Sequence, residues 1–151
     1  MSFFLKIISL CFTVVALTAC QEKPSYNYLV QHPLELKKAV ERCQSNESTT
    51  TAAECDMVMN AANKTMMLLK EQEENPEKFG EKILMVELEY IKAKTASKQT
   101  EQALADLKAK HAPAADIKLA EAKVQLANKA YQDKCDEKRA MLAILSLSTP
   151  Q

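Results

Sequence analysis

Apolar residues recur at spacings of three and four along most of the chain, which is the period of an amphipathic helix. The first such segment reads HPLELKKAVERCQ, and its apolar positions share one face: Leu36, Ala39, Val40 and Cys43. Pro33 suits the first position of a helix, because its missing N–H would have no partner there. The pattern therefore predicts a first helix that begins at Pro33 and ends near Cys43.

The polar stretch SNESTTTAAE interrupts this pattern and leads into a second helix. Thr51 and Glu54 have the spacing of a capping box, so we expect the helix to start at Thr51. Its predicted inner face consists of Cys55, Val58, Met59, Ala62, Met66 and Leu69. Because the helix should end in the polar run KEQEEN, residues 28–75 are predicted to form a short helical hairpin.

Two longer apolar patterns follow and are separated by a break at Pro113. The first starts at Pro76 behind an Asn75 cap and keeps a heptad register to about Lys110. Its apolar side is Ile83, Val86, Tyr90, Ala93, Ser97, Thr100, Leu104 and Leu107. The second pattern runs from about Ala114 to Leu147, with Ile117, Ala120, Val124, Ala127, Tyr131, Cys135, Leu142 and Leu145 on one side.

Each of these stretches has about 34 residues and would be about 50 Å long as a helix. Equal lengths on both sides of a proline predict an antiparallel, coiled-coil-like helical hairpin over residues 76–147, with residues 148–151 as a tail. Alanine in the seam would let the two helices approach closely. The alternative is one kinked helix that dimerises with a second chain.

The N-terminal pattern differs, because one charge at Lys6 is followed by a continuous apolar run. The run from Ile7 to Leu17 is too short for a membrane span, which needs about 20 residues. A charged start, a short apolar core and small residues at the exit are typical of a secretory signal peptide, here residues 1–19. The polar stretch QEKPSYN then predicts a tether, so residues 20–27 would hold the first mature residue and a linker.

The tetrapeptide LTAC at the end of this run resembles the lipobox of bacterial lipoproteins. The resemblance implies that Cys20 carries lipid and anchors the mature chain to a membrane. Two or more acyl chains give a stable anchor. Gln21 follows the cysteine where Asp would imply retention in the inner membrane, so the resemblance favours the outer membrane, with the domain facing the periplasm.

Composition and charge narrow the fold class and the partners. The chain has 20 basic and 20 acidic residues, one glycine and no tryptophan. No alternating segment bounded by turn signals occurs, so the prediction is an all-α protein. No basic stripe is present, and we expect no binding to nucleic acid.

Three cysteines remain after the signal peptide and the lipid site. Cys43 and Cys55 would lie at the facing ends of the first two helices. In an oxidising compartment we expect them to form a disulfide that clamps the short hairpin, and the alternative is two buried free thiols. Cys135 is expected either as a thiol in the seam of the long hairpin or as the link of a disulfide-bonded homodimer.

No motif for catalysis, phosphate binding or metal binding occurs, so we expect neither an enzyme nor a cofactor. The methionines of the second helix suggest contacts instead. Met59 and Met66 fall on the predicted inner face and are expected to fill the core. Met57 and Met67 fall off that face, and they are candidates for an adaptable surface that binds a protein partner.

The first 90 residues resemble the EexN-type entry-exclusion lipoproteins encoded with conjugative type IV secretion systems. The resemblance rests on Tyr28, His32, Pro33, Leu36, Cys43, Cys55, Asn60 and Ala61 behind the lipobox. It implies a lipoprotein that binds part of a mating apparatus and blocks redundant DNA transfer without catalysis. The alternative is a structural or assembly lipoprotein of the envelope or of a secretion machine.

Overall fold

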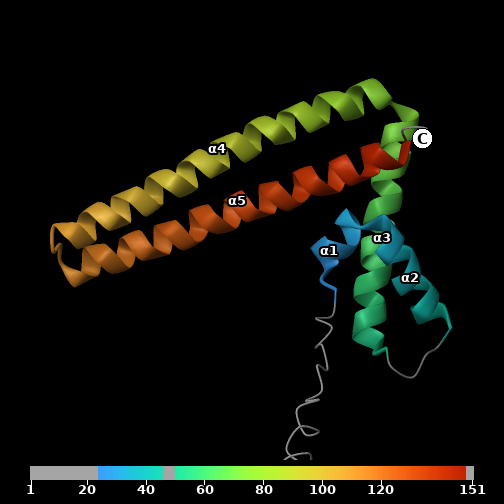
Figure 1. The fold of residues 1–151 in the computed structure, drawn as a ribbon, viewed down its shortest axis with the longest axis horizontal. Helices are drawn as coiled ribbons and strands as arrows, with labels where there is room; N and C mark the ends of the chain where they lie inside the picture. Colours follow the sequence, from blue (N-terminus) through green and yellow to red (C-terminus); the bar gives the residue numbers. More distant parts are fainter. Residues whose placement is uncertain (1–23, 46–49, 149–151) are drawn as a thin grey trace, which may run out of the picture.

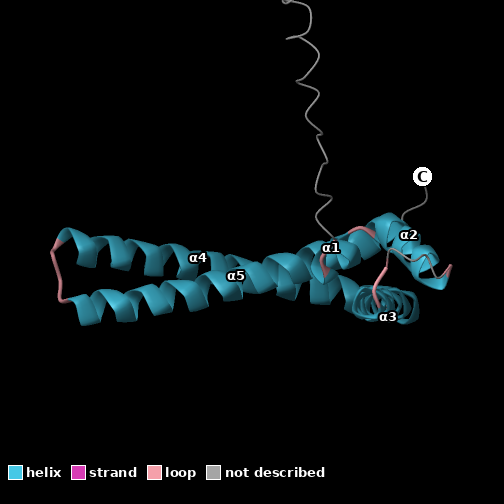
Figure 2. Ribbon diagram, turned by 90° about the horizontal axis from the view of Figure 1, so that it is seen from below, coloured by secondary structure: helices cyan, strands magenta, loops and turns pink. Residues whose placement is uncertain are grey.

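The structure is a computed structural model that describes residues 24–45 and 50–148. Within these ranges it contains five helices and no strand, as Figures 1 and 2 show. The helices are α1 (Tyr26–Gln31), α2 (Pro33–Gln44), α3 (Ala52–Glu74), α4 (Pro76–Ala109) and α5 (Ala114–Ser148). We call α1 to α3 the head and the α4–α5 pair the arm. The predicted all-α class is confirmed.

The helix starts follow from capping residues that the sequence displays. The Thr51 side chain accepts a hydrogen bond from the backbone N–H of Glu54, whose carboxylate accepts one from the backbone N–H of Thr51. The Asn75 side chain caps α4 by accepting from the N–H of Lys78 at 2.9 Å. Such caps satisfy N–H groups that have no partner inside the helix, so both predicted starts are confirmed.

The arm is the predicted antiparallel hairpin, because α4 and α5 of the same chain lie side by side along their length (Figure 1). The rings of Tyr90 and Tyr131 meet across the seam with centroids 5.5 Å apart. The single kinked helix is therefore not the fold of this chain.

Three ion pairs connect the two helices of the arm and hold its register. Lys134 approaches Glu89 at 2.6 Å, and Lys138 approaches Glu87 at 2.5 Å. Nearer the tip, Lys108 and Glu121 are 2.9 Å apart. The hydrogen bond from Lys134 lowers the pKa of Glu89, so this pair contributes at neutral pH and is lost as the pH falls through that lowered value.

The tip of the arm is a tight turn that ends α4 at Ala109. The N–H of Ala112 donates to the carbonyl of Leu107, and the N–H of His111 donates to that of Lys108. This pattern is a Schellman motif, in which the residue after the cap takes a left-handed conformation. His111 holds that position with φ of 50°, where glycine is the usual residue.

The middle of the seam is lined by small and polar side chains and contains a hydrogen-bonded layer. The hydroxyl of buried Ser97 bonds to the side-chain oxygen of Asn128 at 2.5 Å, and the amide of Asn128 donates to Glu101. Such side chains bury little apolar area. Hydrophobic stabilisation is therefore weak in the middle of the arm.

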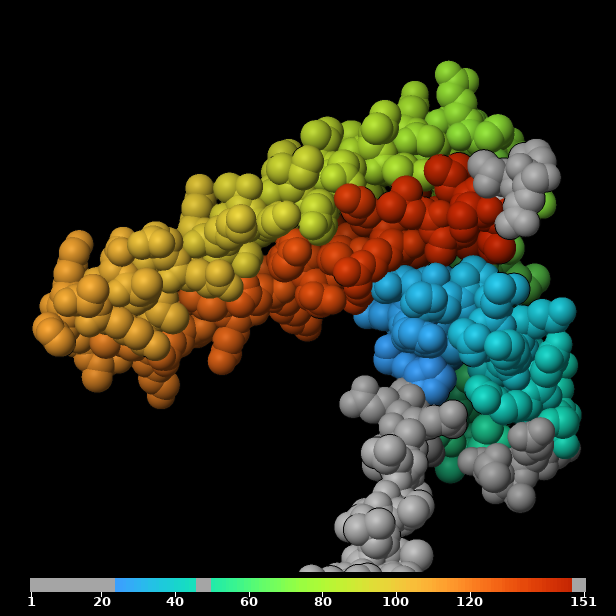
Figure 3. All heavy atoms as spheres, viewed as in Figure 1, coloured from blue at the N-terminus to red at the C-terminus, as the bar shows by residue number. Residues whose placement is uncertain are grey.

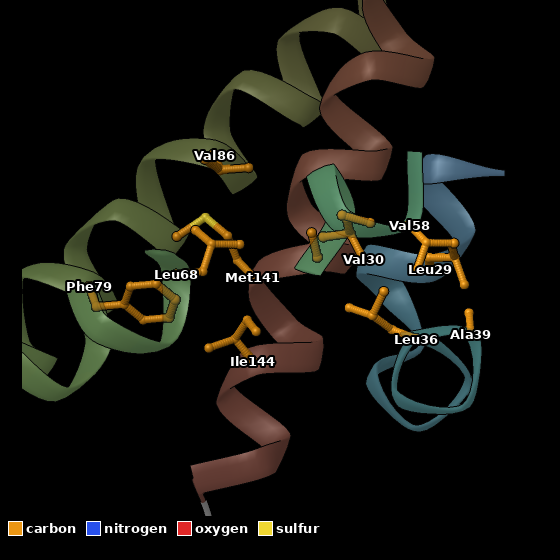
Figure 4. Close-up of a cluster of buried hydrophobic side chains, with 12 residues drawn as sticks. Leu29, Val30, Leu36, Ala39, Val58, Leu68, Phe79, Val86, Met141 and Ile144 are labelled. Atoms are coloured by element: carbon orange, nitrogen blue, oxygen red, sulfur yellow. The ribbon is translucent and has the colours of Figure 1, made fainter. Parts of the chain in front are cut away.

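The main core lies where the end of α5 meets the head. Figure 4 shows Met141 and Ile144 of α5 near Leu68 of α3 and Phe79 of α4, with Leu29 and Val30 of α1 on the other side. Figure 2 looks down α3 while the arm lies in the plane, so α3 crosses the arm at a large angle. The end of α5 is thus enclosed by α4 on one side and by α1 and α3 on the other.

The predicted seam holds along α4 and along α5 as far as Cys135, but it is wrong at the end of α5. Leu142 and Leu145 were expected inside and are exposed, whereas Met141 and Ile144 are buried. The cause is the additional contact with the head, which shifts the buried face around the helix.

The predicted inner face of α3 is also partly wrong. Met59 and Met66 are exposed instead of filling the core. Val58, Ala61, Thr65 and Leu68 are the buried positions. This helix packs against α1, α2, α4 and α5, so its buried face is set by several neighbours rather than by one stripe.

The last two residues of the predicted tether belong to α1. Ser25 caps this helix by accepting from the N–H of Tyr28, and Leu29 and Val30 are buried in the core. The sequence pattern predicts a linker at Tyr26 and Asn27, and the structure places both in α1.

We expect Ile144→Ala to lower the free energy of unfolding by about 2–5 kcal/mol, because it removes a fully buried side chain at the junction. Leu104→Ala, at a half-buried position near the tip, should cost only about 1 kcal/mol. Urea unfolding followed by circular dichroism measures both. Equal losses would contradict a core concentrated at the junction.

Candidate partner-binding surfaces

A disulfide fastens the corner between α2 and α3 of the head. The sulfur atoms of Cys43 and Cys55 are 2.16 Å apart, and their Cα atoms are 5.5 Å apart. Cys43 lies in the last turn of α2, and Cys55 lies in the first turn of α3. The predicted disulfide-clamped hairpin is therefore present. The bond holds the end of α2 against the start of α3.

Helix α1 completes the head by docking on α5 through hydrogen bonds. The carboxylate of Asp136 accepts from the side-chain amide of Asn27 at 2.7 Å and from that of Gln31 at 3.0 Å. Sequence reasoning missed these residues. The available signal was Ser25 ahead of a short YNYLVQ segment, which has the form of an N-cap followed by a helical turn.

A cleft of about 250 Å³ opens beside this contact, where α1, α3, α4 and α5 meet. Its apolar residues are Val30, Leu68, Ala140 and Met141. Lys64 and Lys82 line it together with Asp133, Asp136 and Glu137. Small-molecule sites usually occupy about 300–1,000 Å³, so this cleft is smaller than a typical site of that kind.

The structure separates the two methionines proposed as partner contacts. Met57 packs against the core and is half-buried, so it offers little surface. Met67 is 68% exposed on α3, and Met66 beside it is 66% exposed. Met59 is also exposed. Flexible thioether side chains adapt to varied partner surfaces, so the exposed methionines form the candidate contact surface of the head.

Cys135 is a free, half-buried cysteine on the α4-facing side of α5. A disulfide between two copies would require this side of the helix to be uncovered. Its partial burial agrees with the predicted position of this thiol in the seam of the arm.

Both histidines lie at chain corners. His32 ends α1 and precedes α2, with its ring 4.2 Å from that of Tyr28. His111 forms the turn at the tip of the arm. In residues 24–45 and 50–148, no three His, Cys, Asp or Glu side chains gather as they would around a metal ion.

The predicted lipid site at Cys20 and the signal peptide lie outside the described residues. Among the helices that are described, none has the length and apolar content needed to cross a membrane. No protein-family model, curated protein or solved structure matches this chain.

Replacing both disulfide cysteines, as Cys43→Ser/Cys55→Ser, should lower the free energy of unfolding by about 3 kcal/mol, because the closed loop limits the unfolded chain. Thermal or urea unfolding of the oxidised protein measures this loss. The matched control is Cys135→Ser, which changes a cysteine outside the disulfide and should cost much less. Recovery of both thiols in alkylated form without reductant would contradict the bond.

Proposed function

We propose that this protein is a membrane-anchored bacterial lipoprotein that excludes entry of a related conjugative element. It would bind a protein component of the type IV secretion apparatus and would catalyse no reaction. The support from the sequence is the lipobox-like LTAC at Cys20 and the resemblance over residues 1–90. The support from the structure is a clamped head with exposed apolar side chains.

The observation that carries the proposal is the exposed Met67 on a helix that the disulfide holds in place. Contiguous exposed apolar patches mark surfaces that bind other molecules, and Met66 beside Met67 extends the exposed apolar area here. A surface held rigid before binding loses less conformational entropy when the partner docks. The head therefore has the properties of a preformed docking site.

The length of chain before α1 would keep this site near the membrane. Five residues, 21–25, separate Cys20 from α1, and they span at most about 17 Å when extended. A head held this close to a lipid surface would meet an apparatus that touches the same membrane.

A structural or assembly role in the envelope is the second candidate. The observation that favours it is the arm, a hairpin of two helices with 34 and 35 residues joined by ion pairs. Such an arm could serve as a spacer between parts of a larger assembly.

Lipid attachment is testable by metabolic labelling with palmitate. We expect the full-length protein to be labelled and to partition with membranes, because the acyl chains would be buried in the bilayer. Cys20→Ala should abolish both properties, and Cys11→Ala is the matched control that should keep them. Equal labelling of the Cys20→Ala protein would contradict the lipid site.

Exclusion is testable in mating assays with recipients that carry different variants. The wild type should reduce transfer of the cognate element and leave unrelated elements unaffected. Met67→Glu should weaken exclusion about tenfold, because a charge would enter an apolar contact. The matched control is Leu126→Glu, which changes a residue with similar exposure, 71%, on the arm.

The same assay separates the two candidate functions. Cys20→Ala and Cys43→Ser/Cys55→Ser should both restore transfer if exclusion needs the anchor and the clamped head. If the wild type leaves every transfer unchanged while its deletion impairs secretion by the host cell, the structural role replaces exclusion.

A further inference from the structure

The face of α4 that points away from α5 carries an unpartnered apolar stripe. Leu84, Leu88 and Ile91 follow one another at spacings of four and three and share this face, with Met85 beside them. Their exposed fractions range from 49% for Ile91 to 67% for Leu84. The arm's seam is on the opposite side of the helix. In Figure 3, α4 forms the upper edge of the molecule, and no other described helix lies above it.

Charged residues flank the stripe in an ordered way. Glu77 and Glu81 precede it, and the exposed lysines Lys92 and Lys98 follow it. Lys98 lies at the margin of this face, because it also lines a hollow beside Asn128 of α5. Within residues 24–45 and 50–148, none of these four side chains forms an ion pair. In contrast, Glu87 and Glu89 at the edge of the seam form ion pairs with lysines of α5. The outward charges are therefore available to a partner.

The apolar stripe and its flanking charges would match those of a second copy of α4 that runs in the opposite direction. The stripe, the Glu81–Lys92 pair and the Glu77–Lys98 pair are all centred between residues 86 and 88. An antiparallel copy would place each glutamate near a lysine of the other chain and would stack the two apolar stripes. We propose that α4 pairs through this outward face with the same face of a second copy, in antiparallel orientation.

The charges favour a second copy over a lipid surface as the occupant. Amphipathic helices that bind anionic membranes carry basic residues along the polar margins of their apolar face. Here one end of the stripe is acidic, and an anionic bilayer would repel it. A reversed copy satisfies both ends at once.

The stripe covers only about two turns of helix, so the paired surface is small. Stable complexes usually bury about 1,200–2,000 Å² in total. The pair should therefore be reversible and should depend on protein concentration. This inference does not rest on the proposed function, because the candidate contact at Met67 lies on the head.

The first test introduces one cysteine into the full-length chain, purified in mild detergent, with Cys135→Ser to remove the free thiol of the described residues. Leu88→Cys places the new thiol next to the predicted two-fold axis, so copper phenanthroline should produce a disulfide-linked dimer. Thr95→Cys is the matched control, because the two thiols would lie about 22 Å apart along the pair. Equal dimer yields at the two positions, or none at Leu88→Cys, would overturn the proposal.

The second test exchanges charges in the Leu88→Cys protein. Glu81→Lys or Lys92→Glu alone creates two like-charge contacts, and each should reduce the dimer yield about tenfold. An equal mixture of the two single variants should restore the yield as a heterodimer, and the double variant should restore it as a homodimer. A dimer yield that stays the same in all of these variants would overturn the antiparallel pairing. Circular dichroism spectra equal to that of the Leu88→Cys protein would show that the variants fold.

Discussion

The structure depends on the burial of two opposite sides of α5 near its C-terminal end. Met141 and Ile144 have almost no exposed surface, because α4 covers one side of this segment while α1 and α3 cover the other. The head and the arm therefore share one core and are not separate units joined by a linker. Packing of this kind couples parts that are distant in sequence, so loss of contact at the junction would weaken both.

The sequence was sufficient where a helix has one dominant partner. Along α4 every predicted seam residue from Ile83 to Leu107 is at least partly buried, because α5 is the main neighbour of that face. The helix starts were also predictable, since Thr51 and Asn75 satisfy backbone N–H groups through local hydrogen bonds. Both kinds of signal are contained in a few neighbouring residues.

The prediction failed where several helices meet. A single stripe on α3 placed Met59 inside, but the helix contacts four others, and the buried side moved to Ala61 and Leu68. In α5 the contact with the head moved burial from Leu145 to Ile144. Helix α1 was missed because six residues are too few for a periodic pattern. The residues of α1 also give no indication that the helix docks on Asp136, which lies at least 105 residues away in the sequence.

The candidate site was predictable to a similar degree. The cysteine pair is defined by helix ends, so the disulfide followed from the pattern. Met57 and Met67 are candidates because they fall off the predicted inner face of α3, and since that face is partly wrong, only Met67 is well exposed. The cleft beside α1 could not be predicted, because four helices contribute to it.

The turn at the tip decides whether an arm is completed by its own chain or shared between chains. Exchange of α5 between two chains would require residues 110–113 to straighten into one continuous helix. Pro113 would then stand in the helix interior, which costs about 3 kcal/mol, whereas release of His111 from its left-handed conformation returns only about 1–2 kcal/mol. The balance favours closure of the arm within one chain over exchange of α5 between two chains.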